Sequence, residues 1–150
     1  MMTVKEKLHI ECKQFLDSRF LAVVNRIETI QDSLQSETKS SAGDKHETGR
    51  AMLQLEREKA GNQLKDIQYQ QDTFSRVNIL LKSPVICLGS LVKTNVTTYF
   101  ISISVGKIVV DDKAYFAISP RSPIGSILLG KTIGDKFVFN GLHQQVIDVV

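Results

Sequence analysis

The chain of 150 residues is 42% hydrophobic and 23% charged, which is typical of soluble globular proteins and excludes a mostly disordered chain. Its net charge is only +3, so a general nucleic-acid-coating role would need a local basic patch, and no such block of residues occurs. No apolar run approaches the roughly 20 residues that cross a bilayer, and residues 1–10 lack a signal-peptide core. We therefore expect a cytoplasmic protein with no membrane partner.

The composition changes near Ser83-Pro84. All three prolines and six of the nine glycines follow this point, and no glutamate does. The change predicts two domains, residues 1–82 and residues 83–150. Cys12 and Cys87 fall one in each part and can form at most one bridge, so in a cytoplasmic protein we expect two buried free thiols.

Residues 1–82 are predicted to form an antiparallel coiled-coil hairpin, because apolar residues recur at helical spacing in two stretches. In the first stretch they are Leu16, Phe20, Val23, Ile27, Ile30 and Leu34; in the second they are Leu53, Ala60, Leu64, Ile67, Phe74 and Leu81. At about 1.5 Å per residue, arms of roughly 33 residues would be on the order of 50 Å long. We expect such arms to project, with residues 36–50 at the tip.

Residues 83–150 are predicted to form a small β-rich domain with one short helix, which makes the fold class α+β. The strand candidates are residues 85–92, 99–105, 114–118, 137–139 and 146–150. Hairpin turns are expected at Asp111-Asp112-Lys113 and at Gly134-Asp135. The helix is expected to have Ser122 as its N-cap, Pro123 in its first position and Gly130 at its end.

The predicted tip contains two carboxylates three residues apart, Asp44 and Glu47. Their spacing alone favours a capping-box arrangement, in which both side chains bind main-chain N–H groups at the start of the second helix. The same pair could instead give oxygen ligands to Mg²⁺, which needs only one or two carboxylates, inside the cavity of another molecule. His46, between them, is expected to be solvated, and the isolated His9 and His143 indicate no zinc site.

Residues 125–132 match the phosphate-loop pattern Gly-x-x-x-x-Gly-Lys-Thr. A phosphate loop follows a strand and opens a helix, so that helical N–H groups converge on the phosphates. Here the helical pattern precedes Lys131 and a turn follows it. We therefore expect no nucleotide binding at this segment.

Two neighbouring motifs, Ile118-Ser-Pro-Arg-Ser-Pro-Ile-Gly125 and Leu128-Leu-Gly-Lys-x-x-Gly-Asp135, together resemble the C-terminal signature of the Gre family of bacterial transcript-cleavage factors. Residues 89–92, Gly-Ser-Leu-Val, are similar to the start of the family's C-terminal domain. The resemblance spans essentially the whole chain. It implies an FKBP-like C-terminal domain after an N-terminal coiled-coil hairpin.

At the tip, Gly43, Asp44 and Glu47 match the Gly-Asp-x-x-Glu of the family. The resemblance implies that these carboxylates enter the secondary channel of DNA-directed RNA polymerase and help bind its second catalytic Mg²⁺ beside the 3′ end of the nascent RNA. The protein would then not be an enzyme itself, but would stimulate the polymerase's own RNA cleavage. No tightly bound cofactor and no small-molecule substrate are implied. Lys45 and Arg50 would be further tip contacts.

The resemblance also implies a polymerase-docking surface on the C-terminal domain, made of Ser122, Pro123, Gly125, Lys131, Gly134 and Asp135. The glycines and the proline have an equally good explanation as caps and turns. After Glu47 the family usually continues with Asn-Ala-acidic-Tyr, whereas this chain has Thr48-Gly49-Arg50-Ala51. We expect Arg50 to help orient the tip by contacting the RNA phosphate or a polymerase carboxylate.

Three other functions remain open from the sequence. A secondary-channel regulator that does not support cleavage has the same architecture. A coiled-coil adaptor needs neither carboxylate. A prolyl isomerase follows from fold analogy alone and is the least favoured, because the chain has no Trp and only 7% aromatic residues.

Overall fold

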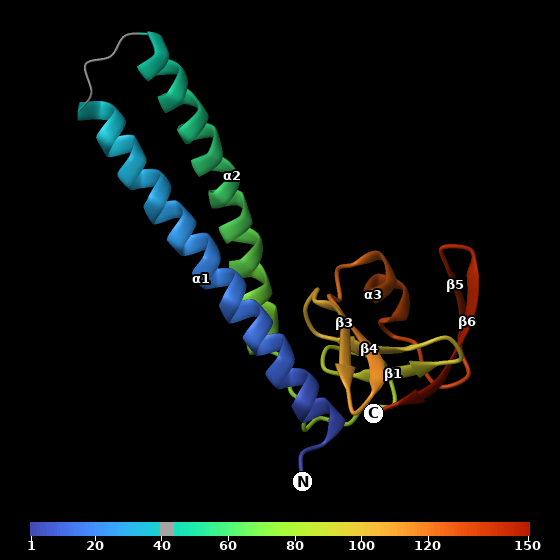
Figure 1. The fold of residues 1–150 in the computed structure, drawn as a ribbon. Coiled ribbons are helices and arrows are strands. Elements are labelled where there is room, and N and C mark those ends of the chain that lie inside the picture. Colours follow the sequence, from blue (N-terminus) through green and yellow to red (C-terminus); the bar gives the residue numbers. More distant parts are fainter. Residues whose placement is uncertain (40–43) are drawn as a thin grey trace. The chain divides into compact units, whose positions relative to one another are not determined.

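The computed structural model describes residues 1–39 and 44–150, and of residues 37–39 and 44–46 it describes the backbone alone. The described chain forms a long helical hairpin followed by a six-stranded sheet with one short helix, which confirms the predicted α+β class (Figure 1). The elements in chain order are α1 (Val4–Lys39), α2 (Asp44–Ser75), β1 (Leu91–Thr94), β2 (Thr98–Ile101), β3 (Gly106–Val110), β4 (Lys113–Ile118), α3 (Pro123–Leu128), β5 (Lys136–Phe139) and β6 (Leu142–Val149).

The chain divides into two compact units. One contains Met1–Phe15 together with Gln70–Val150, and the other contains Leu16–Tyr69. The first unit therefore includes the start of α1 and the end of α2 as well as the sheet. The predicted boundary at Ser83-Pro84 means that the segments before and after it should fold independently of each other, and this stays a prediction.

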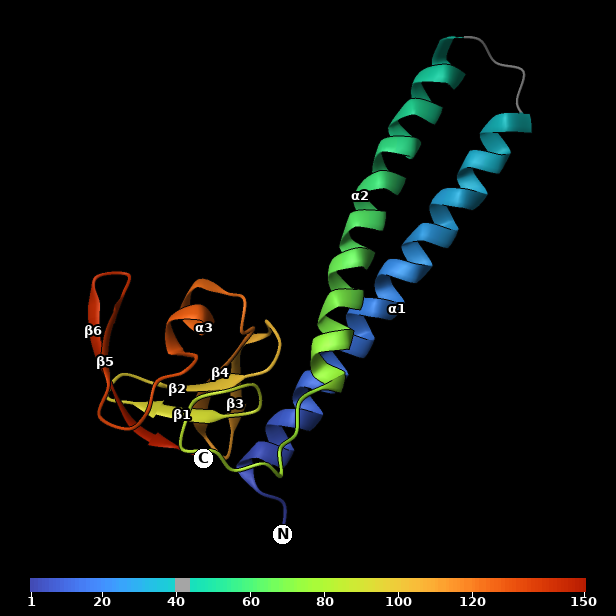
Figure 2. The same cartoon turned by 180° about the vertical axis from the view of Figure 1, so that it is seen from behind.

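In the second unit, α1 and α2 run antiparallel side by side (Figures 1 and 2). Ile27, Ile30 and Ala60 are buried at its centre. The partly buried residues around them are Val23, Leu34, Leu53 and Leu64. All seven belong to the two predicted apolar stretches, so the helical periodicity located this interface correctly.

The second helix ends earlier than its heptad pattern predicted. α2 stops at Ser75, and Leu81, predicted to continue the stripe, lies outside the helix with 53% of its surface exposed. The main-chain N–H groups of Arg76 and Val77 bond three residues back, which tightens the last turn. The side-chain oxygen of Asn78 then accepts from Leu80 N at 3.0 Å. An asparagine that bonds its own backbone in this way favours a turn over a continuing helix.

The sheet has the strand order β3-β4-β2-β1-β6-β5, with β2 and β4 parallel and the other neighbours antiparallel. Its buried core includes Val92, Ile101 and Val146 from the strands and Ile124 and Leu128 from α3. Burial of these side chains joins α3 to the sheet.

The predicted strand over residues 85–92 is wrong for most of its length, because only Leu91 and Val92 belong to β1. Ile86 is buried but its main chain bonds to Gly130 and Lys131 outside the sheet. Gly89 follows with φ of +93°, a left-handed conformation that interrupts an extended chain. An apolar run here indicates burial without strand pairing.

Two tight hairpins shape the sheet. Asp111 and Asp112, with φ of +50° and +64°, connect β3 to β4, as predicted. The second hairpin was predicted at Gly134-Asp135, but it lies at Asn140-Gly141, with φ of +50° and +75° between β5 and β6. Two successive left-handed residues are what a two-residue hairpin loop needs, and Asn-Gly supplies them at low cost.

The helical residues of the first unit pack with its strands. Leu8 and Cys12 of α1 are fully buried, and Cys12 Sγ lies 3.7 Å from Ser102 Oγ. Lys7 pairs with Asp111 at 3.0 Å, and Gln70 Oε1 accepts from Ser104 N at 3.0 Å. Both ends of the hairpin therefore contribute to the compact unit that contains the sheet.

Both cysteines are free, as expected, but only Cys12 is buried, and Cys87 is half-buried. Burial raises the pKa of the Cys12 thiol to about 11. In the described ranges, 1–39 and 44–150, no helix is long and apolar enough to span a membrane.

Candidate functional site

The connected end of the helical hairpin is the first candidate site. α2 begins at Asp44, and Glu47 lies in its first turn with an exposed side chain. The N-terminal end of a helix carries a partial positive charge, which stabilises carboxylates there. Gly43 and the side chains of Asp44 and Lys45 lie outside the described residues, so the geometry of the acidic pair stays a prediction.

The second helix begins where the spacing of Asp44 and Glu47 predicted. α2 starts at Asp44, and α1 continues to Lys39, inside the segment 36–50 that was predicted as the tip. Thr48, Gly49 and Arg50 are therefore helical. This places the residues that depart from the Gre motif within the regular backbone of α2.

Arg50 connects the two arms. Its Nη1 donates a hydrogen bond of 3.0 Å to the main-chain oxygen of Leu34 on α1, and its side chain is partly buried. The sequence predicted that this cation contacts a bound partner, and that contact stays a prediction. The bond shows how Arg50 holds the first turns of α2 against α1.

In the predicted docking segment, the first three residues have clear structural roles. Ser122 Oγ accepts from Gly125 N at 3.1 Å and caps α3, while it donates to Ser119 O at 2.6 Å. Pro123 occupies the start of the helix, as predicted. A Cβ on Gly125 would lie 2.1 Å from Ser119 O, so no other residue fits there without a shift of the backbone.

The remaining predicted docking residues follow α3. The main chain of Lys131 bonds to Ile86 and Leu128, and Gly130 and Gly134 have φ of +85° and +95°. Asp135 Oδ2 accepts from Thr132 N at 2.8 Å and closes the turn before β5. These bonds give the residues of the motif a structural role in the turns between α3 and β5. A contact with polymerase stays a prediction.

The phosphate-loop match has the structural context that the sequence indicated. α3 occupies most of the segment before Lys131, and β5 follows it. No helix starts after the Gly-Lys-Thr, so no helical N-terminus faces that lysine.

Among the side chains that the structure describes, the titratable groups with shifted pKa values are Lys5, His9 and Cys12, and all three lie in the first unit. Burial lowers the pKa of His9, with a smaller contribution from Lys13, and burial also lowers the pKa of Lys5. The His9 ring stacks on Phe74 at a centroid distance of 4.5 Å. Among the residues whose side chains are described, no group of three or more His, Cys, Asp or Glu residues is placed to hold a metal ion.

A cavity on the β5–β6 hairpin was not predicted from the sequence. It has a volume of about 420 Å³ and involves residues that carry no recognisable motif, including Asn95, Lys136 and Gln144. The Asn140-Gly141 pair would have located the hairpin, since this dipeptide is a strong hairpin signal. The cavity itself depends on side-chain contacts that sequence spacing does not show.

No family model matches the chain, and no curated protein matches it. Among solved structures, the chain is similar to the structure of the transcription factor Gfh1. The two are 22% identical, the match covers 91% of each chain, and the TM-score is 0.36. Similarity at this level carries no functional argument, so the function has to be argued from the motifs and the geometry.

Proposed function

We propose that this chain is a transcription factor that inserts its helical hairpin into the secondary channel of bacterial RNA polymerase and stimulates cleavage of backtracked RNA. The observation that carries the proposal is the position of the Gly-Asp-x-x-Glu motif. α2 begins at Asp44, and Glu47 is exposed in its first turn, at the connected end of a long two-helix hairpin.

The dimensions of the hairpin support insertion. Residues 44–69 of α2 lie in the hairpin unit, which at about 1.5 Å per residue corresponds to roughly 40 Å of helix. A single helix is about 10–12 Å across, so two side by side form a thin rod. The buried Ile27, Ile30 and Ala60 stiffen this rod. It can deliver a carboxylate into a channel too narrow for a globular domain.

The chemistry that we assign to the chain is to help bind a metal ion and to orient the attacking water. RNA cleavage by a polymerase is a two-metal displacement, in which one ion activates the attacking water and both stabilise the charge that develops. Asp44 and Glu47 would supply oxygen ligands that help hold the second Mg²⁺ and would orient the water. The polymerase supplies the remaining ligands, and this chain supplies no nucleophile.

A transcript-cleavage assay with stalled elongation complexes of the cognate polymerase tests the proposal. We expect the wild-type protein to shorten the RNA and Glu47→Gln to lose roughly a hundredfold in rate, because a misplaced or absent ligand has effects of that order. Glu58→Gln is the matched control, since Glu58 is also exposed on α2. It should cleave as wild type does.

The same assay distinguishes stimulation of cleavage from the alternative function, a secondary-channel regulator that does not support cleavage. If the wild-type protein slows nucleotide addition at saturating concentration and yields no shortened RNA, the chain is a non-cleaving occupant of the channel. Failure to bind the polymerase at all would favour a coiled-coil adaptor.

A further inference from the structure

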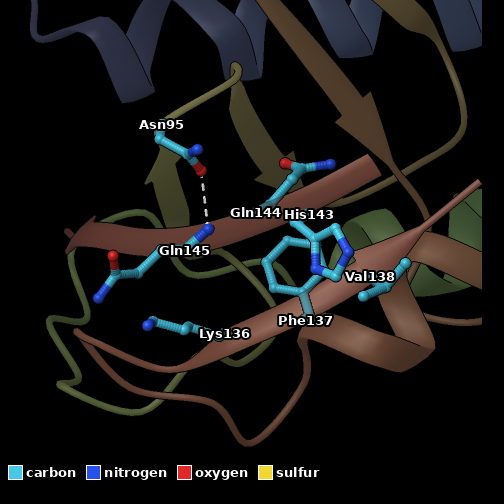
Figure 3. Close-up of a pocket in the computed structure, with 7 residues that line it drawn as sticks. All are labelled: Asn95, Lys136, Phe137, Val138, His143, Gln144 and Gln145. Atoms are coloured by element: carbon cyan, nitrogen blue, oxygen red, sulfur yellow. Dashed lines mark hydrogen bonds between the residues drawn. The ribbon is translucent and has the colours of Figure 1, made fainter. Parts of the chain in front are cut away.

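Two cavities in the first unit differ in how their polar side chains are arranged. In the cavity on the β5–β6 hairpin (Figure 3), Lys136 and Gln144 belong to successive residue pairs, so they lie on opposite faces of the hairpin. Its polar groups therefore do not gather on one side. A second cavity, of about 450 Å³, lies over β1, β2, β4 and the end of β6, and we call it the Tyr115 cavity after one of its lining residues.

Strand pairing places four polar residues of the Tyr115 cavity in one row. Lys93 of β1 is paired with Thr98 of β2 on one side and with Asp148 of β6 on the other. In the parallel pairing of β2 with β4, the register continued by one residue sets Thr98 beside Tyr115. Paired residues project from the same face of a sheet. The row therefore runs over four neighbouring strands, β4, β2, β1 and β6, on one face.

The remaining cation and the apolar wall of the cavity share this face. Lys113 lies two residues before Tyr115 on β4, and Leu91 lies two residues before Lys93 on β1. The main chains of Leu91 and Val150 exchange hydrogen bonds of 3.0 and 2.9 Å, so these two residues form an apolar row beside the polar one. The cavity thus combines two ammonium groups, two hydroxyl groups and one carboxylate with an apolar wall.

The hydroxyl group of Tyr115 is a fixed hydrogen-bond donor. Only 9% of the surface of Tyr115 is exposed, so packing holds its ring in place. Among the described side chains, Lys5 Nζ is the one buried nitrogen or oxygen atom without a partner. The Tyr115 hydroxyl, which also forms no hydrogen bond with a described residue, is therefore open to the cavity. A donor that is already fixed loses little conformational entropy when it binds a ligand.

The charged groups of the cavity are available to a ligand. Lys93 and Lys113 are exposed, and neither forms an ion pair or hydrogen bond with the part of the chain that the structure describes. Asp148 lies opposite Lys93, but its Oδ1 accepts from Val149 N at 3.0 Å instead of pairing with the lysine. The other carboxylate oxygen of Asp148 is left as an acceptor.

This set of groups complements a phosphate monoester that carries hydroxyl groups. A phosphate monoester has about two negative charges at pH 7 and three strong acceptor oxygens. The two ammonium groups match its charge, and the hydroxyls of Thr98 and Tyr115 can donate to its oxygens. Asp148 would repel a bare anion, but it can accept from a hydroxyl group on the molecule that carries the phosphate. The carboxylate therefore favours a sugar phosphate over free phosphate.

We propose that the Tyr115 cavity binds a small phosphate monoester with hydroxyl groups, such as a sugar phosphate. Lys93, Lys113 and the two hydroxyls hold the phosphate, and Asp148 accepts from a hydroxyl of the sugar. The cavity lies in the first unit and contains none of the residues of the acidic tip. It would bind its ligand whether or not the chain stimulates RNA cleavage.

An NMR titration of the full-length ¹⁵N-labelled protein tests the proposal. The probes are ribose 5-phosphate, inorganic phosphate and ribose, compared at equal concentrations and equal ionic strength. We expect ribose 5-phosphate to shift the main-chain amide signals of Lys93, Thr98 and Tyr115 in a saturable way. Inorganic phosphate should bind roughly tenfold more weakly, because it lacks the hydroxyl that donates to Asp148. Ribose, which carries no charge, should cause no shifts.

Three variants assign the binding to the cavity. Tyr115→Phe keeps the buried ring but removes the hydroxyl, and Lys93→Gln removes a cation. Each should weaken ribose 5-phosphate by roughly tenfold, since each removes a hydrogen bond to a charged group. Lys107→Gln is the matched control. Lys107 is exposed on β3 and is paired with Phe116, the residue after Tyr115, so it lies on the other face of the sheet and its loss should have no effect.

Asp148→Ala tests recognition of the sugar separately from recognition of the phosphate. Without the carboxylate, ribose 5-phosphate and inorganic phosphate should bind with similar affinity. Equal affinity of the wild-type protein for these two probes would overturn sugar recognition and leave an adventitious ion only. The absence of saturable shifts with ribose 5-phosphate, or unchanged affinity in both Tyr115→Phe and Lys93→Gln, would overturn the site itself.

Discussion

Arg50 of α2 donates a hydrogen bond from Nη1 to the main-chain oxygen of Leu34 on α1, at 3.0 Å. Arg50 lies three residues beyond Glu47, so the two side chains project from the same side of the helix. The bond joins the arms less than one helical turn from an exposed carboxylate. This gives Arg50 a positioning role that does not depend on any contact with RNA.

Replacing Arg50 by methionine should loosen the arms near Glu47 while keeping the aliphatic bulk of the side chain. We expect stimulation of RNA cleavage to fall roughly tenfold or more, since a small misplacement of a catalytic group is costly. Polymerase binding should change little. Cleavage rates measured at saturating protein, together with a binding assay, check this. A loss confined to binding would contradict the positioning role.

The glycine of the C-terminal motif should tolerate no side chain. Gly125→Ala places a Cβ 2.1 Å from Ser119 O, and we expect a loss of about 3 kcal/mol in the free energy of unfolding. Urea denaturation gives the value.

Gly61→Ala is the matched comparison for that substitution. Its Cβ would meet only the flexible end of Arg57, at 3.0 Å, in the middle of α2. Alanine is the better helix former by about 1 kcal/mol, so this variant should be more stable than wild type. Equal effects of the two substitutions would contradict the packing argument.

Sequence periodicity located the hairpin because its buried residues, which include Ile27, Ile30 and Ala60, belong to two stretches in which apolar residues recur at helical spacing. It failed at the end of α2, where the local bond from Leu80 N to Asn78 decides the outcome. A heptad pattern records which residues are apolar, but it does not record this competition for backbone hydrogen bonds. Leu81 therefore fits the seven-residue repeat of apolar residues, although α2 ends at Ser75 and Leu81 lies outside the helix.

Contacts distant in sequence were beyond prediction for a different reason. Cys12 and Ser102 lie 90 residues apart, and neither belongs to a motif. Their proximity follows from the packing of α1 residues with the strands. For the candidate site, the motif predicted the start of α2 and its acidic first turn, while the bond from Arg50 to Leu34 depends on the register of two helices.

Acidification should destabilise the first unit through His9. Burial against Phe74 lowers the pKa of His9 below its ordinary 6.5, so the unfolded chain binds the proton more readily than the folded one. The stabilisation from the neutral ring is present above pH 6.5 and is lost as the pH falls through the lower folded pKa. Melting temperatures from pH 7.5 to 5 should fall further for wild type than for His9→Phe, which keeps the ring stack. Parallel pH profiles would contradict this assignment.

The two thiols should differ sharply in reactivity. Cys12 is fully buried with its pKa raised to about 11, whereas Cys87 is half-buried. At pH 8 we expect a thiol reagent to label Cys87 in the folded protein and to reach Cys12 only after unfolding. Mass spectrometry of the labelled peptides distinguishes the two sites.

Cys12 should also make stability depend on alkaline pH. The unfolded thiol loses its proton near pH 9.0 and the folded one near pH 11, so stability should decrease as the pH rises through this interval. Cys12→Ala should lack that decrease when the two proteins are compared by urea denaturation. Fast labelling of Cys12 in the folded state would contradict both expectations.

The most direct test of the account is RNA cleavage by Asp44→Ser with the cognate polymerase. Serine is as good an N-cap as aspartate, so it keeps the start of α2 while it removes the carboxylate. If Asp44 is a metal ligand, this variant should bind polymerase as wild type does and should stimulate little or no cleavage. Full stimulation by Asp44→Ser would show that Asp44 only begins the helix, and it would contradict the proposed function of the acidic pair.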